Sequence, residues 1–263
     1  MDHSHATTYT SKIIRAGALL ADTKTLLHQW HETLSIADNL KRAREDNIFG
    51  KSSRSWISQF LRSFRQRYLT DPSNALALVA LAKGGLPPES LNPILYFYVA
   101  QDDPLLHAVV TDLLLPFHAQ GRTEVSPDDT RRAIRGWIDC GLIPSAWSEN
   151  TINRASKNLM ATLRDFGILQ GAARKWLAPV YLPVEAFAFI AFVLHQDQPS
   201  GQRLIAHPEW QLFFLTPSTV EGYFGEAHQR HLLEYQAAGS IVRITFPAST
   251  LEEYAHVILQ RAA

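Results

Sequence analysis

Two segments of this chain have the apolar period of a long helix, and each also carries a basic outward face. From Arg54 to Leu69 the inward positions are Trp56, Ile57, Phe60, Leu61, Phe64 and Tyr68. From Glu149 to about Asp165 they are Ile152, Ala155, Leu159 and Leu163. A serine that can cap the helix stands before each segment: Ser52 or Ser53, and Ser148. The chain must therefore build its core mainly by packing amphipathic helices against one another.

Helix signals dominate the rest of the sequence as well. Further helices are predicted, from caps, glycine stops and apolar period, at 11–21, 23–32, 35–47, 74–82, 94–100, 105–115 and 126–140. Extended segments are few: two short pieces within Ile168–Leu182, shaped like a β-wing, and one strand at Ser240–Phe246. This pattern predicts an all-α, mainly helical fold with helix-turn-helix or winged-helix-like elements and a few short strands.

A chain of 263 residues is long enough for one large domain or two ordinary ones. The polar segment Gln120–Ser126 looks like a hinge and divides the chain in two. Residues 1–120 then form an N-terminal helical part with the first basic block, and residues 121–263 a winged-helix-like part followed by C-terminal helices. The first ten residues read as a flexible leader.

Composition narrows the class of protein. A hydrophobic content of 46% supports a real core and excludes a wholly disordered chain. The single cysteine, Cys140, excludes an intramolecular disulfide and a cysteine-based zinc framework. The polar start shows no signal peptide, which predicts a cytoplasmic protein.

One apolar stretch, Leu177–Leu194, resembles a membrane span. Pro179, Pro183 and Glu185 interrupt it and leave an unbroken run only from residue 186 to 194. As a helix this run covers about 14 Å, against roughly 30 Å of hydrocarbon in a bilayer. A buried core helix is predicted instead, with no membrane contact.

The positive charge is concentrated although the formal net charge is zero. From Lys41 to Arg67 eight Lys/Arg stand against two acids, a local charge of +6. From Arg131 to Lys175 eight stand against three, a local charge of +5, so the remainder must carry −11. Two basic faces on an acidic body are what a molecule needs to attract a polyanion in one orientation.

The second block has the order of a helix-turn-helix: helix, short Gly-Leu-Ile-Pro connection, capped helix, basic hairpin. Side chains on the outer face of its second helix are able to hold phosphates or read base edges. The predicted DNA-binding residues on this helix are Asn150, Thr151, Arg154, Lys157 and Asn158. Arg174 and Lys175 are predicted at the tip of the hairpin. The alternative interpretation is an ordinary amphipathic helix with a solvated polar face.

The first block is more basic and less regular. Its predicted DNA-binding residues are Lys51, Ser53, Arg54, Arg62 and Arg65, with Lys41, Arg42 and Arg44 on the helix before them. Arginine also serves protein contacts, so the alternative here is a subunit or domain interface that pairs with acidic residues.

The enzymatic interpretations are weaker. The tripeptide Gly-Lys-Ser at 50–52 imitates the end of a phosphate-binding loop, but Glu45 stands where that loop requires glycine. Cys140 lies at an apolar helix end and is interpreted as a small core thiol. Two histidine pairs have i, i+3 spacing without an obvious third ligand: His28 with His31, and His228 with His231. We therefore expect no enzymatic activity, no cofactor and no metal site.

The order and spacing of several segments resemble the BrxA family of bacteriophage-exclusion (BREX) defence systems. These segments are Tyr9-Thr-Ser-Lys, Gly17-Ala-Leu-Leu, Asn47-Ile-Phe-Gly-Lys-Ser-Ser-Arg-Ser, Phe60-Leu-Arg-Ser-Phe-Arg-Gln-Arg-Tyr-Leu, Pro93-Ile-Leu-Tyr-Phe-Tyr-Val-Ala, Thr151-Ile-Asn-Arg and Leu163-Arg-Asp-Phe-Gly-Ile-Leu. Together they extend from Tyr9 to about Leu194. The part after Pro199 matches less firmly.

The resemblance implies a compact, almost wholly helical protein whose helix-turn-helix elements bind double-stranded DNA. It also implies a non-enzymatic accessory role beside other BREX subunits, such as a methyltransferase and an ATPase. We expect the chain alone to be a monomer. Two further interpretations stay open: a scaffold that docks acidic partner subunits, and RNA binding through shape and phosphate contacts.

Overall fold

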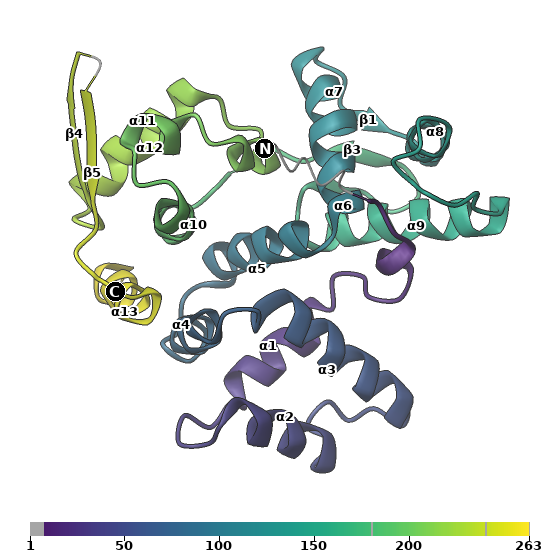
Figure 1. Ribbon diagram of the computed structural model, residues 1–263, viewed down its shortest axis with the longest axis horizontal. Coiled ribbons are helices and arrows are strands. Elements are labelled where there is room, and N and C mark those ends of the chain that lie inside the picture. The colour runs from purple at the N-terminus through teal and green to yellow at the C-terminus, as the bar shows by residue number, and fades with distance from the viewer. Residues whose placement is uncertain (1–7, 180, 240, 263) are drawn as a thin grey trace, which may run out of the picture. The chain divides into compact units, whose positions relative to one another are not determined.

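The computed structural model describes residues 8–179, 181–239 and 241–262. The chain is mainly helical with a few short antiparallel strands, so the predicted fold class is confirmed (Figure 1). The described residues form two compact units. Unit 1 contains those within 1–18, 99–180 and 211–214, and unit 2 contains those within 19–98, 181–210 and 215–263. The chain crosses between the units several times, so they do not divide at the predicted boundary after residue 120.

Unit 1 is built around two capped helices and a small sheet. Its elements are η1 (Ser11–Ile14), α6 (Pro104–Ala108), a π-helical turn (Val109–Leu114), α7 (Leu115–Ala119), β1 (Glu124–Val125), α8 (Pro127–Asp139), α9 (Glu149–Asp165), β2 (Leu169–Gln170) and β3 (Lys175–Leu177). Helix α8 packs against α9, and η1 also packs against α9 (Figure 1). The predicted start and end of α9 are confirmed.

The three short strands form one antiparallel sheet with β3 in the middle. Leu169 of β2 faces Leu177 of β3, and both side chains are buried. On the other side of β3, Glu124 of β1 faces Trp176. The segment 120–126, predicted as a hinge, therefore contributes a strand. Its pairing with a segment some fifty residues later is not visible in the local sequence.

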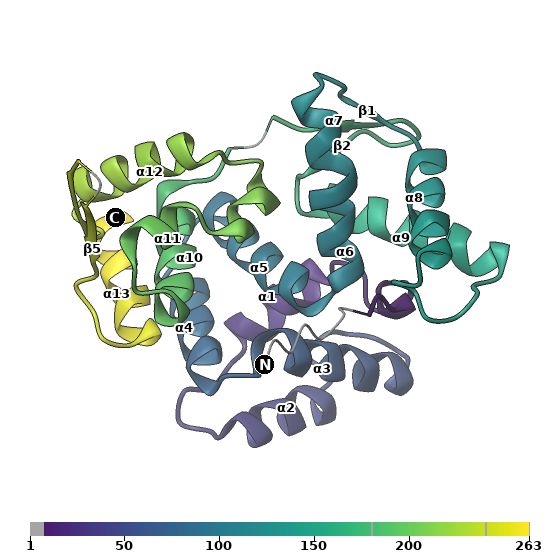
Figure 2. The ribbon, with the colours of Figure 1, turned by 45° about the horizontal axis from the view of Figure 1, so that its top comes forward.

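Unit 2 contains the N-terminal helices and the C-terminal part of the chain. Its elements are α1 (Leu20–His28), α2 (Ile36–Glu45), α3 (Arg54–Tyr68), α4 (Pro72–Lys83), α10 (Val184–Asp197), α11 (Gly201–Ile205), α12 (Pro217–Gln229), β4 (Glu234–Ala238), β5 (Ile241–Thr245) and α13 (Leu251–Ala262). Two further elements cross between the units, α5 (Pro88–Asp102) and η3 (Pro208–Phe213). Helix α4 packs against α1 and α13 (Figure 2), and β4 and β5 form a hairpin (Figure 1).

Helix α10 forms the centre of the unit 2 core, as predicted for residues 186–194. Phe187 stacks on the rings of Trp210 and Tyr223, with centroids 4.6 Å and 4.9 Å away. Phe192 stacks on Tyr254 of α13 at 4.7 Å. In the described part of the chain, no helix combines the length and the apolar character needed to cross a bilayer.

The N-terminal region differs from the prediction. The helix expected at 11–21 is a short 3₁₀ turn followed by a break, and α1 begins only at Leu20. Leu19 has a φ of 52°, which continues no right-handed helix. The helix expected to reach residue 32 ends at His28. Most of the predicted leader lies outside the described residues, but Tyr9 packs edge-on against Trp137 at 5.4 Å.

Candidate nucleic-acid interface

Helix α8 begins with a fully formed capping box. The Ser126 Oγ accepts from the Asp129 N–H at 3.2 Å, and the Ser126 N–H donates to Asp129 Oδ2 at 2.9 Å. Arg122, just before β1, forms an ion pair with the same carboxylate. Burial would raise the pKa of Asp129, but the hydrogen bonds of Ser126 and the Arg122 guanidinium outweigh it and hold the pKa below its usual value. The network joins β1 to the start of α8.

The connection between α8 and α9 is short, and a hydrogen bond and an ion pair hold it in place. Gly141 has a φ of 79° and ends α8 as predicted. Ile143 is buried, and its N–H donates to the Trp137 carbonyl at 3.1 Å. Across the turn, Arg135 Nη2 lies 2.7 Å from the Glu149 Oε2. These contacts hold α9 against α8.

Helix α9 presents an outward face that is polar and basic. Its Ser148 cap accepts from the Thr151 N–H at 3.2 Å. Arg154 and Lys157 are exposed, and among the described residues no carboxylate forms an ion pair with either. Asn158 is half-buried and donates to the Arg154 carbonyl at 2.8 Å. Asn150 is exposed on the first turn, so the five predicted residues of this helix lie on or beside one surface.

The hairpin separates its two predicted cations. Arg174 is exposed in the loop between β2 and β3, as predicted. Lys175 is not at the tip: it is 8% exposed, and its ammonium donates to the Gly171 carbonyl at 2.9 Å and to the Ala172 carbonyl. The alternation of side chains along a strand turns Lys175 inward, where it ties the loop together.

Much of the second block's charge is neutralised locally. Four of its arginines form ion pairs, namely Arg131 with Asp128, Arg132 with Asp129, Arg135 with Glu149, and Arg164 with Asp165. Two of these acids, Asp128 and Asp129, precede the window that gave +5. Of the four cations left without a carboxylate among the described residues, Lys175 is buried and Arg154, Lys157 and Arg174 are exposed.

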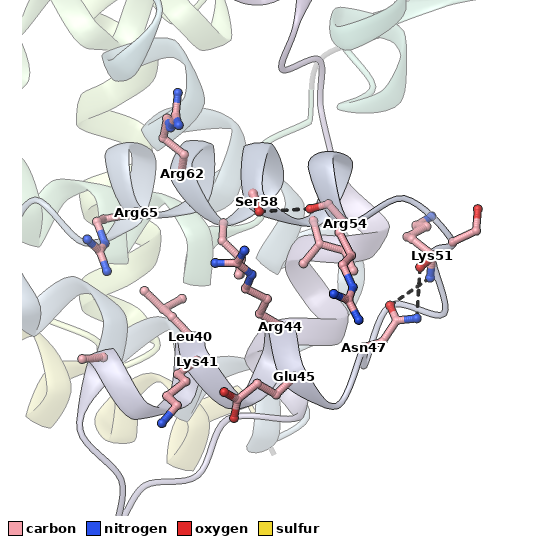
Figure 3. A pocket seen from close by; sticks show the side chains of 14 residues that line it. Leu40, Lys41, Arg44, Glu45, Asn47, Lys51, Arg54, Ser58, Arg62 and Arg65 are labelled. Atoms are coloured by element: carbon pink, nitrogen blue, oxygen red, sulfur yellow. Dashed lines mark hydrogen bonds between the residues drawn. The ribbon is translucent and has the colours of Figure 1, made fainter.

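The first block forms a groove between α2 and α3, with a volume of about 970 Å³. Its lining residues are Ala37, Leu40, Lys41, Arg44, Glu45, Asn47, Lys51, Ser52, Arg54, Ile57, Ser58, Leu61, Arg62 and Arg65. In Figure 3 the Arg44 side chain extends from α2 towards α3, and Arg54 extends from α3 into the space between the helices. We call this feature the α2–α3 groove.

Most of the positive charge of the α2–α3 groove is not neutralised by neighbouring carboxylates. Within the described ranges no carboxylate forms an ion pair with any of the five basic residues that line its two walls: Lys41, Arg44, Arg54, Arg62 and Arg65. Lys51 differs, because its ammonium lies 3.2 Å from Asp22 Oδ1 and 4.8 Å from the centroid of the Trp56 ring. Arg42 is also used internally, through Asp46 and the Gln29 carbonyl.

The loop that closes one end of the groove is locally rigid. Asn47 adopts a φ of 46°, and its side chain bonds both the N–H and the carbonyl of Lys51, at 3.1 Å and 3.0 Å. Ser53 caps α3 by accepting from the Trp56 N–H at 3.2 Å. The Ser53 hydroxyl therefore has a structural role, and Gly50, with a φ of 61°, turns the chain into the helix.

The histidine pairs do not share a helix face. Helix α1 ends at His28 and α12 ends at Gln229, so His31 and His231 lie beyond the helices that their spacing predicted. In the described part of the chain, no three His, Cys, Asp or Glu side chains are arranged to hold a metal ion. Cys140 is exposed and is not the core thiol that was predicted.

Sequence analysis placed Lys41 and Arg44 in the first basic block but did not count them among the predicted DNA-binding residues. Lys41 and Arg44 line the α2 wall of the groove, opposite the predicted residues of α3. Their i, i+3 spacing on the polar face of α2 was the available signal. It did not show that the two basic faces oppose each other, because that depends on how α2 packs against α3.

Comparison with known proteins gives one family. The family model described as BrxA matches residues 7–193 of the chain, which is more than half of its length. No curated protein matches the sequence.

Proposed function

The chain belongs to the BrxA family and is thus a component of bacteriophage-exclusion (BREX) phage defence, and from this premise we propose that it is a non-enzymatic subunit that binds double-stranded DNA. The observation that carries the proposal is the outward face of α9. There Arg154 and Lys157 stand exposed and without an ion-pair partner among the described residues, on the second helix of a fixed helix pair.

Duplex DNA is recognised by elements that protrude into its grooves. Helix α9 follows α8 after a pinned turn, and the β2–β3 hairpin carries Arg174 after it. This is the order of a winged helix, in which the second helix enters the major groove and the hairpin meets the backbone beside it. The proposal narrows the predicted two-face interface to α9 and the hairpin, because their exposed cations Arg154, Lys157 and Arg174 follow one another in the order of a winged helix.

Phosphate contacts should dominate the affinity. Three unpaired cations are few, and the outward side chains of α9 include Asn150 and Thr151, which suit phosphates as well as bases. We therefore propose modest sequence preference and affinity that falls with added salt. Other BREX subunits, such as a methyltransferase or an ATPase, would supply the remaining affinity and the chemistry.

The first test is fluorescence anisotropy of a labelled DNA duplex against the purified chain. The double substitution Arg154→Glu with Lys157→Glu should weaken binding by at least about 100-fold, because two attractions become two repulsions. A matched control is Arg203→Glu with Arg261→Glu, which changes the net charge equally on exposed residues of unit 2. Equal affinity of the α9 variant and the control would overturn the assignment to α9.

Duplex RNA is the second ligand in the same assay. An A-form helix has a deep, narrow major groove that side chains cannot read. If α9 works in a major groove, DNA should bind more tightly than RNA of the same sequence. Tighter binding of RNA would favour the alternative that the basic faces hold RNA by shape.

A further inference from the structure

The α2–α3 groove combines features that the proposed DNA interface lacks. Its two walls carry five cations without an ion-pair partner among the described residues, against one acid, Glu45. Between the walls lies an aliphatic floor made of Ala37, Leu40, Ile57 and Leu61. Leu40 and Ile57 belong to the core of unit 2, so the floor is anchored.

The shape of the groove suits a narrow ligand. Its cations face one another across a depression, whereas duplex DNA is read by elements that protrude. Two turns of an α-helix with side chains, about 10–12 Å across and about 11 Å long, occupy on the order of 1,000 Å³. The volume of about 970 Å³ is close to this value.

The chemistry of the lining separates a peptide from a nucleic-acid strand. Proteins that hold single strands provide aromatic side chains on which the bases stack. None of the described residues that line the groove is aromatic. An aliphatic floor instead matches the apolar stripe of an amphipathic helix. Four of the five wall cations are arginines, whose guanidinium forks pair with carboxylates.

We propose that the α2–α3 groove docks an acidic amphipathic helix of a partner protein. The apolar stripe of that helix lies on Leu40, Ile57 and Leu61, and its flanking Asp and Glu side chains pair with the arginines of the two walls. This goes beyond DNA binding, because it assigns the two basic blocks different ligands: α9 contacts the duplex, and the groove holds the chain to another subunit.

Three fluorescent 18-residue peptides test the proposal with the full-length chain. The first has leucines at helical i, i+3, i+4 and i+7 spacing with flanking glutamates, and the second replaces each glutamate by glutamine. The third scrambles the first, so that its composition and charge are kept and its apolar stripe is lost. The first peptide should bind at least about tenfold more tightly than either control, because only it offers both the stripe and the carboxylates.

Charge reversal locates the binding. Arg62→Glu with Arg65→Glu should abolish the preference for the first peptide and leave duplex binding within about twofold. The α9 variant Arg154→Glu with Lys157→Glu should do the opposite. Because both arginines are exposed, circular dichroism should show an unchanged fold. Arg44→Gln, on the other wall, should weaken the peptide several-fold and so provides a second, milder variant.

Three outcomes would overturn the proposal: equal binding of the three peptides, peptide binding unaffected by the groove variants, or displacement of the peptide by equimolar single-stranded oligothymidylate. The last result would make the groove a nucleic-acid site. If the α9 variant still binds the duplex as tightly as the parent chain, the proposed function fails and the groove proposal stands.

Discussion

At the residue scale, exposure and ion pairing decide which basic side chains can meet a ligand. Arg154 and Lys175 contribute equally to a charge count, but one is exposed and the other is buried beneath the hairpin loop. A sequence window cannot separate these cases. A sequence window also cannot show that Arg131 forms an ion pair with Asp128. The candidate residues were predictable because periodicity gives the outward face of a helix. The acidic side chains with which some of them form ion pairs were not predictable.

Asp129 gives a prediction about stability at this scale. Its folded-state pKa is depressed, so its contribution is present above the unfolded pKa and is lost as pH falls through the folded value. Asp129→Asn should lower the free energy of unfolding by about 1–2 kcal/mol at pH 7. Urea denaturation at a series of pH values measures this. The difference from the parent chain should shrink as the pH drops below 4, and a constant difference would contradict the ionic explanation.

At the element scale, the long capped helices were predictable and the sheet was not. Helices α3, α8 and α9 carry their signals locally, in Ser53, Ser126 and Ser148, and their bounds were predicted to within one residue. Strand β1 pairs with a segment some fifty residues away, and the sequence around β1 contains no signal that predicts this pairing. The α2–α3 groove was missed for the same reason, because it depends on packing between elements.

The hairpin offers a prediction at this scale. Lys175→Met keeps an unbranched side chain of similar shape but removes the donor that the Gly171 and Ala172 carbonyls share. We expect a loss of about 1–3 kcal/mol in the free energy of unfolding. Arg174→Met, one position earlier and exposed, should leave stability unchanged and weaken duplex binding several-fold. Thermal denaturation and DNA anisotropy of the two variants separate these roles, and equal stability of both would refute the structural role of Lys175.

At the scale of the whole molecule, the two basic surfaces lie on different units, α9 and the hairpin on unit 1 and the groove on unit 2. The salt dependence of duplex binding counts how many of their cations act. Three cations on unit 1 predict a log–log slope of about −3, and eight cations on both units predict about −7. Measuring the affinity for a labelled duplex between about 50 and about 300 mM salt distinguishes the two slopes. A slope near −7 would show that the groove also holds DNA.

The packing of α13 against α4 has a consequence for how the chain is made. Helix α4 is synthesised early, but its partner, Leu251–Ala262, follows only after about 170 further residues, and a Cβ on Gly84 would meet the Leu259 side chain at 2.4 Å. Most of unit 1 comes from one continuous stretch that leaves the ribosome in between. Unit 1 should therefore fold first during translation. The apolar surface of α4 that α13 covers stays exposed until the last helix is synthesised, and we expect chaperones to protect it in that interval.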